Sequence, residues 1–196
     1  MQYEKGEEYY QRGDYENAVV WYRKGADGGN ADAQFSLAEC YRYGRGVEAN
    51  TAKAAQWYRE AARQGHEYSK GKLYECYSGN YIEPESQEEF MQWLHWGAEG
   101  GHADAQYRLH QYYTSGTTYI QKDPQEALRW LKKAAAQNHV NAVFDLGKHY
   151  QYSRIGNKYQ YDEAIECFEK AAKMGHPQAQ KRLKECRSER FWDSFN

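Results

Sequence analysis

The stretch that decides the fold is residues 31–65, which read ADAQFSLAECYRYGRGVEANTAKAAQWYREAARQG. In its first part, Ala33, Leu37 and Tyr41 stand four residues apart. Side chains at that spacing lie on one face of a helix, so these three form a packing stripe. The run Gly44-Arg-Gly46 then ends this helix, because glycine tolerates the left-handed backbone angles of a turn.

The second part of the same stretch predicts a further helix. Ala54, Trp57 and Ala61 recur at the spacing of an inner helical face. We expect one helix over about 32–43 and another over about 51–64. Small alanines opposite a large tryptophan or tyrosine allow the two helices to approach closely, at roughly 8–10 Å between axes.

This helix pair recurs along the chain with a period of 36 or 37 residues, which indicates a repeat protein. The units span about 1–30, 31–66, 67–102, 103–139 and 140–176, and we expect them to form a single domain with a capping helix and tail over 177–196. The recurring columns are Trp21, Trp57, Trp93 and Trp130 with Cys167 in the next place, Leu37, Leu73, Leu109, Leu146 and Leu183, and His66, His102, His139 and His176.

The composition fits this interpretation. Leu, Ile, Val and Phe make up only 23 of 196 residues, whereas the chain holds 20 Tyr and 6 Trp. Net charge is only −2, so the aliphatic-poor composition does not predict disorder. A β-sandwich is disfavoured because it needs Val and Ile on alternating strands. The composition indicates a helical protein packed with small residues and aromatics.

The 31–65 stretch resembles the Sel-1-like repeat family, a branch of the tetratricopeptide superfamily, in its Ala31-x-Ala33, Gly44-x-Gly46-Val47 and Trp57-Tyr58 motifs. The resemblance implies an all-α fold, a right-handed α-solenoid of helix-turn-helix repeats with a C-terminal capping helix. The unit at 67–102 departs most from the pattern, so we expect the fold there but a different turn. Gly71 and Gly79 in that unit remove side chains and could open a pocket.

The sequence predicts neither a metal site nor a catalytic site. The four repeat-end histidines stand one unit apart, too far for one metal ion, and we expect them to favour a helix C-terminus by their charge. Cys40, Cys76 and Cys186 share one column and are predicted to be buried packing residues. Glu88 and Glu89 are expected on a solvated face. No catalytic motif is present, so we expect no enzyme, no cofactor and no metal.

A helix-pair solenoid presents a concave face lined by the first helix of each pair, and we predict that a partner binds there. Aromatic residues recur on this face, and tyrosine is a preferred contact residue at interfaces. The alternative is that residues such as Phe35 and Tyr107 only pack against the next unit. The predicted binding residues are Tyr3, Glu7, Tyr10, Phe35, Glu39, Arg42, Tyr43, Glu75, Tyr107, Gln111, Phe144, Lys148 and Tyr152.

Carboxylates prevail in the N-terminal half of this predicted face, and Lys148 and Lys181 lie toward its C-terminal end. The N-terminal half is therefore expected to take a basic segment of the bound peptide. The predicted function is a non-enzymatic adaptor that binds a protein or peptide. A cognate inhibitor, such as an immunity protein that neutralises a bacterial toxin, is the alternative, and a hydrolase is the least supported reading.

The remaining expectations concern partners and compartment. A pI near 6.4 gives no basic field for nucleic acid. No run of 18 apolar residues occurs, so no membrane insertion is expected. We expect a monomer in the cytoplasm, or in the periplasm if a signal was removed. The aromatic tail over 191–195 is expected either to fold back on the last helix pair or to dock elsewhere.

Overall fold

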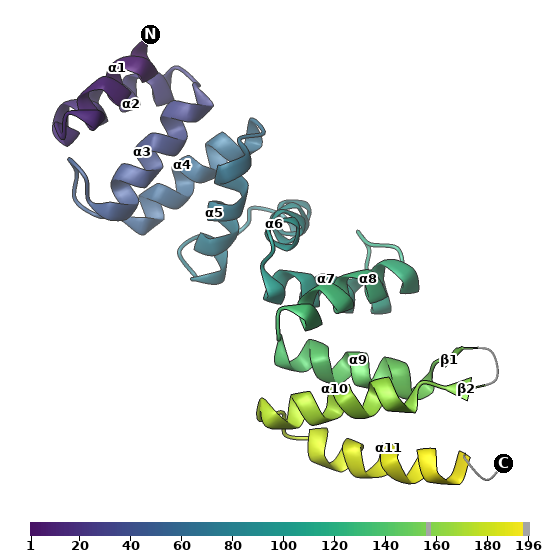
Figure 1. Cartoon of the computed structure of the whole chain (residues 1–196). Helices are drawn as coiled ribbons and strands as arrows, with labels where there is room; N and C mark the ends of the chain where they lie inside the picture. Colours follow the sequence, from purple (N-terminus) through teal and green to yellow (C-terminus); the bar gives the residue numbers. More distant parts are fainter. Residues whose placement is uncertain (156–157, 194–196) are drawn as a thin grey trace. The chain divides into compact units, whose positions relative to one another are not determined.

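The computed structural model describes residues 1–155 and 158–193, and its helices pair as the repeats predict (Figure 1). The chain divides into two compact units at residue 100, called unit 1 and unit 2 here. Unit 1 contains α1 (Gln2–Gln11), α2 (Tyr15–Asp27), α3 (Ala31–Tyr43), α4 (Thr51–Arg63), α5 (Glu67–Ser78) and α6 (Gln87–Glu99). Unit 2 contains α7 (Ala103–Ser115), α8 (Pro124–Ala136), α9 (Val140–Tyr152), β1 (Arg154–Ile155), β2 (Lys158–Tyr159), α10 (Tyr161–Lys173) and α11 (Ala179–Asp193).

The helix boundaries in the deciding stretch are confirmed to within a residue, as α3 and α4 show. Asn30 caps α3 and Asn50 caps α4, and each amide oxygen accepts a hydrogen bond from a backbone N–H in the first turn. The all-α helical-repeat solenoid is therefore the fold, with one small addition. The two-residue strands β1 and β2 pair antiparallel in the turn between α9 and α10.

The expected role of the histidine column is wrong. His66 and His139 stand at the N-caps of α5 and α9, where Nδ1 of each ring accepts a backbone N–H at 3.2 Å. An imidazole nitrogen that accepts must be unprotonated at that position. These two rings therefore cap the start of the following helix, rather than complementing the end of the preceding one.

The core follows the predicted columns and a further one that the sequence analysis missed. Trp93 and Trp130 are buried, whereas Trp57 is only half-buried. The residue after each tryptophan position is the more consistently buried one. This column consists of Tyr22, Tyr58, Leu94, Leu131 and Phe168, each at most 2% exposed.

Glycine faces an aromatic ring at three helix contacts, which is the closest form of the predicted small-against-large packing. A β-carbon at Gly97 of α6 would lie 2.4 Å from the buried Tyr74 ring of α5. The other two pairs are Gly6 with Tyr22 and Gly147 with Phe168. These rings occupy the volume that any larger residue would need.

The cysteine column is buried, as predicted. Cys40, Cys76 and Cys186 are at most 3% exposed, and burial raises the pKa of each thiol to about 11. The fourth, Cys167, is half-buried in the tryptophan column, and its pKa is also raised by burial. Thiols with such pKa values are protonated near neutral pH and act as small packing residues.

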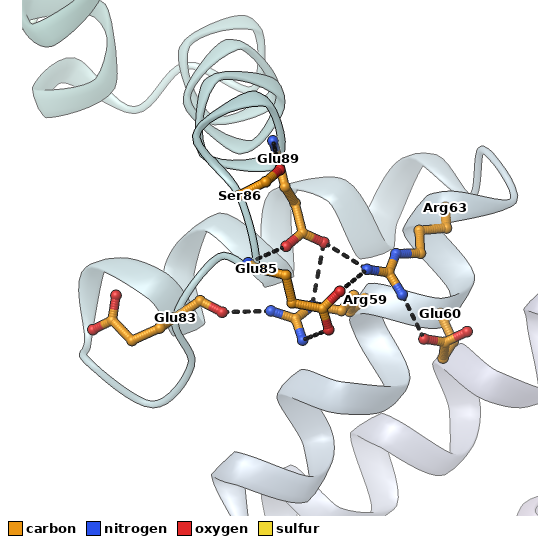
Figure 2. Close-up of polar contacts among 7 residues, drawn as sticks. All are labelled: Arg59, Glu60, Arg63, Glu83, Glu85, Ser86 and Glu89. Atoms are coloured by element: carbon orange, nitrogen blue, oxygen red, sulfur yellow. Dashed lines mark hydrogen bonds and ion pairs between the residues drawn. The ribbon is translucent and has the colours of Figure 1, made fainter.

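The divergent 67–102 unit keeps the helix pair but closes its turn differently. Gly79 does not open a pocket, because the Tyr81 ring lies 2.7 Å from where its β-carbon would be. Around Gly71, by contrast, no atom lies within 4 Å of the β-carbon position. Ion pairs hold this turn against α4: Arg59 and Arg63 of α4 both bind Glu85 of the turn (Figure 2).

This charge network replaces the missing glycine turn. Arg59 donates to Glu85 Oε1 at 2.8 Å and to the Glu83 carbonyl oxygen, and its Nε lies 3.3 Å from Glu89 Oε1. Arg63 donates to Glu85 Oε2 at 2.8 Å and to Glu89 Oε1 at 3.1 Å. The Glu89 side chain is only 11% exposed, so the expectation that it lies on a solvated face is wrong.

Loss of Arg59 should destabilise unit 1 more than loss of Arg63. The Arg59 side chain is 12% exposed and that of Arg63 is 46% exposed. Arg59→Met leaves the shielded Glu89 carboxylate with one charged partner, Arg63, beside the Glu85 backbone N–H, and we expect a cost of about 2 kcal/mol. Arg63→Met should cost about 0.5–1 kcal/mol. Urea unfolding measures both, and equal costs would show that burial of the network contributes nothing.

The C-terminal helix α11 packs on α10 and runs three residues further than the expected end near Arg190. Phe191 and Trp192 therefore belong to a helix, and they are 57% and 66% exposed. They continue α11 rather than forming a separate tail, and Phe191 lines a hollow with Ile165 and Glu169 of α10. Phe195 lies outside the described residues. In the part of the chain that the structure describes, no helix has the length and apolar character needed to cross a membrane.

Candidate functional site

A groove of about 710 Å³ opens between α7, α8 and α9 of unit 2. Its floor is apolar and comes from α8, the second helix of its repeat. Its two walls are polar and come from α7 and α9, the first helices of consecutive repeats. The floor residues are Pro124, Ala127, Leu128 and Leu131, and the wall residues are His110, Gln111, Thr114, Ser115, Asp145, Lys148, His149, Tyr152 and Ser153, with Lys122 from the α7–α8 turn.

Helical periodicity places the lining residues of each wall on one face of its helix. Along α7, the lining positions recur at three- and four-residue spacing from His110 to Thr114, and α9 repeats the spacing from Asp145 to His149. The buried Leu109 and Ala142 on the opposite sides of these helices hold the walls on the core. The groove is therefore a product of the repeat packing rather than of a flexible loop.

One ion pair anchors the α9 wall. Lys148 Nζ lies 2.9 Å from Asp145 Oδ1, and Asp145 Oδ2 accepts a hydrogen bond from the Tyr107 hydroxyl at 2.6 Å. Burial and this bond to the carboxylate raise the pKa of Tyr107. Asp145 is thus shared between a lysine within the groove and a tyrosine behind it, which fixes both side chains.

Two histidines line the groove, and neither belongs to a catalytic triad. His110 Nδ1 lies 3.0 Å from the Ala127 carbonyl oxygen, which can only accept, so this nitrogen donates. His149 Nε2 lies 3.3 Å from Ser153 Oγ, but the groove carboxylate, Asp145, bonds Tyr107 and Lys148 instead. The pKa of His149 is lowered by burial and by the Lys132 and His110 charges. A serine–histidine pair without an orienting acid lacks the arrangement that activates a nucleophile.

The structure places three of the predicted binding residues, Gln111, Lys148 and Tyr152, together in the groove. Their role in binding stays a prediction. Tyr152 is 61% exposed, and its hydroxyl accepts a hydrogen bond from Arg182 Nη1 of α11 at 3.2 Å. No group of three or more metal-ligating side chains lies close enough together to hold an ion within residues 1–155 and 158–193.

Three other predicted binding residues, all aromatic, pack against the next repeat. Each ring packs against the histidine that caps or precedes the following first helix. The aromatic column and the histidine column are therefore two sides of the same contact between repeats. Phe144, at 5% exposed, lies in the core of unit 2 and is removed from the candidate surface. The ring pairs are Phe35 with His66 at 4.7 Å, Tyr107 with His139 at 4.6 Å, and Phe144 with His176 at 3.8 Å.

In unit 1, two predicted carboxylates are held by buried tyrosines. The Tyr22 hydroxyl donates to Glu7 at 2.6 Å, and the Tyr58 hydroxyl donates to Glu39. Burial and these bonds raise the pKa of both tyrosines. Glu7 and Glu39 therefore accept hydrogen bonds from buried tyrosine hydroxyls. This structural role explains why a carboxylate recurs at this position of the first helices.

The other predicted residues of unit 1 also have partners within it. Arg42 Nη1 donates to Glu75 at 3.0 Å, and burial of Glu75 is outweighed by the bonds from Lys72 and Arg42, so its pKa is lowered. Tyr10 accepts from Arg45, whose guanidinium lies 5.2 Å from the Tyr43 ring. Tyr43 is 54% exposed, and Tyr3 is half-buried with its ring 6.2 Å from that of Tyr22.

Sequence reasoning missed His110 and Thr114 of the α7 wall and all of the floor. It examined only the first helices of the repeats, and Leu128 lies on a second helix. It also selected only one residue per helical turn. His110, directly before the predicted Gln111, and Thr114, one turn after it, were therefore left out. The signal that could have found the floor is the Ala127-Leu128 pair of α8, which follows Pro124 after an extended turn.

A chain of helix pairs with a period of 36 or 37 residues and a thin core is a helical-repeat protein. The model of the Sel1 repeat family matches residues 3–30, 31–66, 103–139 and 140–176, which is more than half of the chain. The chain belongs to the Sel1 repeat family, as the resemblance predicted. Sel1 repeats are protein-interaction modules.

A solved structure supports the same assignment. A Sel1 repeat protein from Oxalobacter formigenes is 32% identical over 88% of this chain and 49% of its own, with a TM-score of 0.57. A protective antigen of uropathogenic Escherichia coli with an SLR fold is 28% identical over 93% of this chain and 39% of its own, with a TM-score of 0.49. This chain thus spans half or less of the length of these two proteins.

An immunity protein from Pseudomonas aeruginosa is 20% identical over 89% of this chain and 67% of its own, with a TM-score of 0.37. No curated protein matches the chain.

Proposed function

We propose that this protein is a non-enzymatic adaptor whose unit 2 groove binds a short segment of a protein partner. The observation that carries the proposal is the groove itself, with its apolar floor on α8 and polar walls on α7 and α9. A volume of about 710 Å³ lies within the range of sites that enclose a small ligand or a few side chains.

The groove suits a segment better than the face of a folded domain. A concave site of this size admits one or two side chains with the adjoining backbone, and the amide and hydroxyls of Gln111, Thr114 and Ser115 can bond that backbone. The alternative from the sequence, a cognate inhibitor of a toxin, requires a broad interface of roughly 800 Å² per partner. The adaptor therefore has the more direct support.

A groove-filling variant tests this proposal. Thr114 is exposed on the groove wall, so Thr114→Trp places an indole over the floor without removing a core contact. Peptides selected from a random displayed library on the purified protein should bind this variant at least 30-fold more weakly. Fluorescence anisotropy with the labelled peptide measures the affinity.

The matched control is Glu166→Trp, an exposed position of α10 outside the groove, which should bind the peptide as the unchanged protein does. Melting temperatures of both variants should agree with that of the unchanged protein. A selected peptide that binds Thr114→Trp within threefold of its original affinity would place the binding site elsewhere.

A further inference from the structure

The inner face of unit 2 carries an excess of positive charge, in contrast to the net charge of −2 of the whole chain. The groove is lined by two lysines, Lys122 and Lys148, and by one carboxylate, Asp145. That carboxylate is already satisfied by Lys148 and Tyr107. One lysine charge is therefore left without an ion-pair partner among the residues that line the groove.

Lys122 supplies that charge. It stands in the turn between α7 and α8 at the edge of the apolar floor, and its side chain is exposed. Across the residues that the structure describes, no carboxylate forms an ion pair with it. An exposed lysine beside a concave apolar surface attracts an anionic group, because the low-dielectric wall concentrates the field.

The excess continues along the same face onto α11. Tyr152 lines the groove, and its hydroxyl joins it to Arg182. A second hollow of about 270 Å³ lies there, lined by Lys181 and Arg182 with a single carboxylate, Glu185. Glu185 lies 3.3 Å from Arg182 and 3.9 Å from Lys181. Two cations therefore share one carboxylate, which leaves this hollow with one excess positive charge.

These observations point to one class of occupant. Resting on the proposed function, we propose that the groove takes an acidic–apolar segment within a partner chain, with an apolar side chain on the α8 floor and an internal Asp or Glu carboxylate at Lys122. The apolar contact supplies most of the affinity, and the carboxylate supplies the choice of partner and the register. Further acidic residues of the segment would lie toward Lys181 and Arg182.

Charge reversal tests the proposal with the full-length protein and a peptide selected on it, synthesised with both ends blocked. We expect the selected sequences to be enriched in Asp and Glu beside an apolar residue. Lys122→Glu should weaken binding about 10-fold and Lys122→Gln about threefold. Replacing the matching acid of the peptide by Lys should restore at least fivefold of the affinity for Lys122→Glu. Lys173→Glu, an exposed lysine of α10 outside the groove, is the matched control and should change nothing.

The outcomes separate this inference from the proposed function. If Thr114→Trp abolishes binding but selected peptides lack acids and Lys122→Glu binds equally well, the groove binds a segment and the acidic occupant is refuted. If Thr114→Trp has no effect, the groove itself is not the site and both fail. A peptide that needs its free C-terminal carboxylate, and loses its affinity on amidation, would overturn the internal side chain as the anion.

Discussion

Replacing Gly97 by alanine is expected to lower the free energy of unfolding by about 2–3 kcal/mol, although alanine is the better helix former. The added β-carbon would lie 2.4–2.6 Å from three atoms of the Tyr74 ring. That ring is 2% exposed and enclosed by α5 and α6, so it cannot turn away without opening the core. The overpacking outweighs the gain of about 1 kcal/mol from helix propensity.

Gly71→Ala is the matched control, on the partner helix of the same repeat, and should change stability in the opposite direction. No atom lies within 4 Å of the β-carbon position at Gly71, which is in the interior of α5. We expect a gain of roughly 0.5–1 kcal/mol. Urea unfolding followed by circular dichroism measures both variants, and a Gly97→Ala protein as stable as the original would contradict the close packing of α5 and α6.

Gly46→Ala is the second large effect, with an expected loss of about 3 kcal/mol. The residue has a φ of +69°, and its β-carbon would lie 2.2 Å from the Tyr15 carbonyl oxygen at the start of α2. The left-handed backbone costs a side chain about 1–2 kcal/mol. Displacing the turn from α2 adds a similar overpacking cost, because backbone atoms cannot rotate aside.

Gly65→Ala separates the two causes. Its φ is +90°, but no atom lies within 4 Å of its β-carbon position, so this variant carries the backbone cost alone. Thermal unfolding should place it between the original protein and Gly46→Ala. Equal losses for the two variants would mean that the turn does not rest on α2 as described.

The fold could be predicted from the sequence because similar packing residues recur at equivalent positions in each repeat. One helix pair alone, such as residues 31–65, gives only a periodic pattern, but Leu37, Leu73 and Leu109 in register make chance agreement untenable. The residue after each tryptophan was overlooked because it varies between Tyr, Leu and Phe, which share size and apolarity but not identity.

The role of the histidine column needed three-dimensional geometry. Periodicity places His139 at the junction of two helices, and both a C-terminal cation and an N-terminal cap are compatible with that position. Only the 3.2 Å contact from the Ala142 N–H to its Nδ1 decides between them. The Phe144 ring shows the same limit, since helical register places it near the inner face and its stacking on His176 buries it.

The groove was only half predictable for a related reason. The α9 residues Lys148 and Tyr152 follow from the register of the first helices, but the floor arises from where α8 lies relative to its neighbours. The turn from Gly116 to Asp123 sets that position, and its Thr117 and Ile120 hydrogen bonds have no signature in the repeat pattern. In unit 1, Glu89 was likewise expected on a solvated face, and only its contact with the shielded Arg59 shows that it is buried.

The most direct test of the groove as the binding site is a photo-crosslink from the bound peptide. A benzoyl-phenylalanine in place of the peptide's apolar residue is irradiated in the complex, and mass spectrometry locates the linked residue. The account predicts linkage to Leu128, Leu131 or Thr114 around the floor of the groove. Linkage to unit 1, or to the exposed side of α10 or α11, would contradict it.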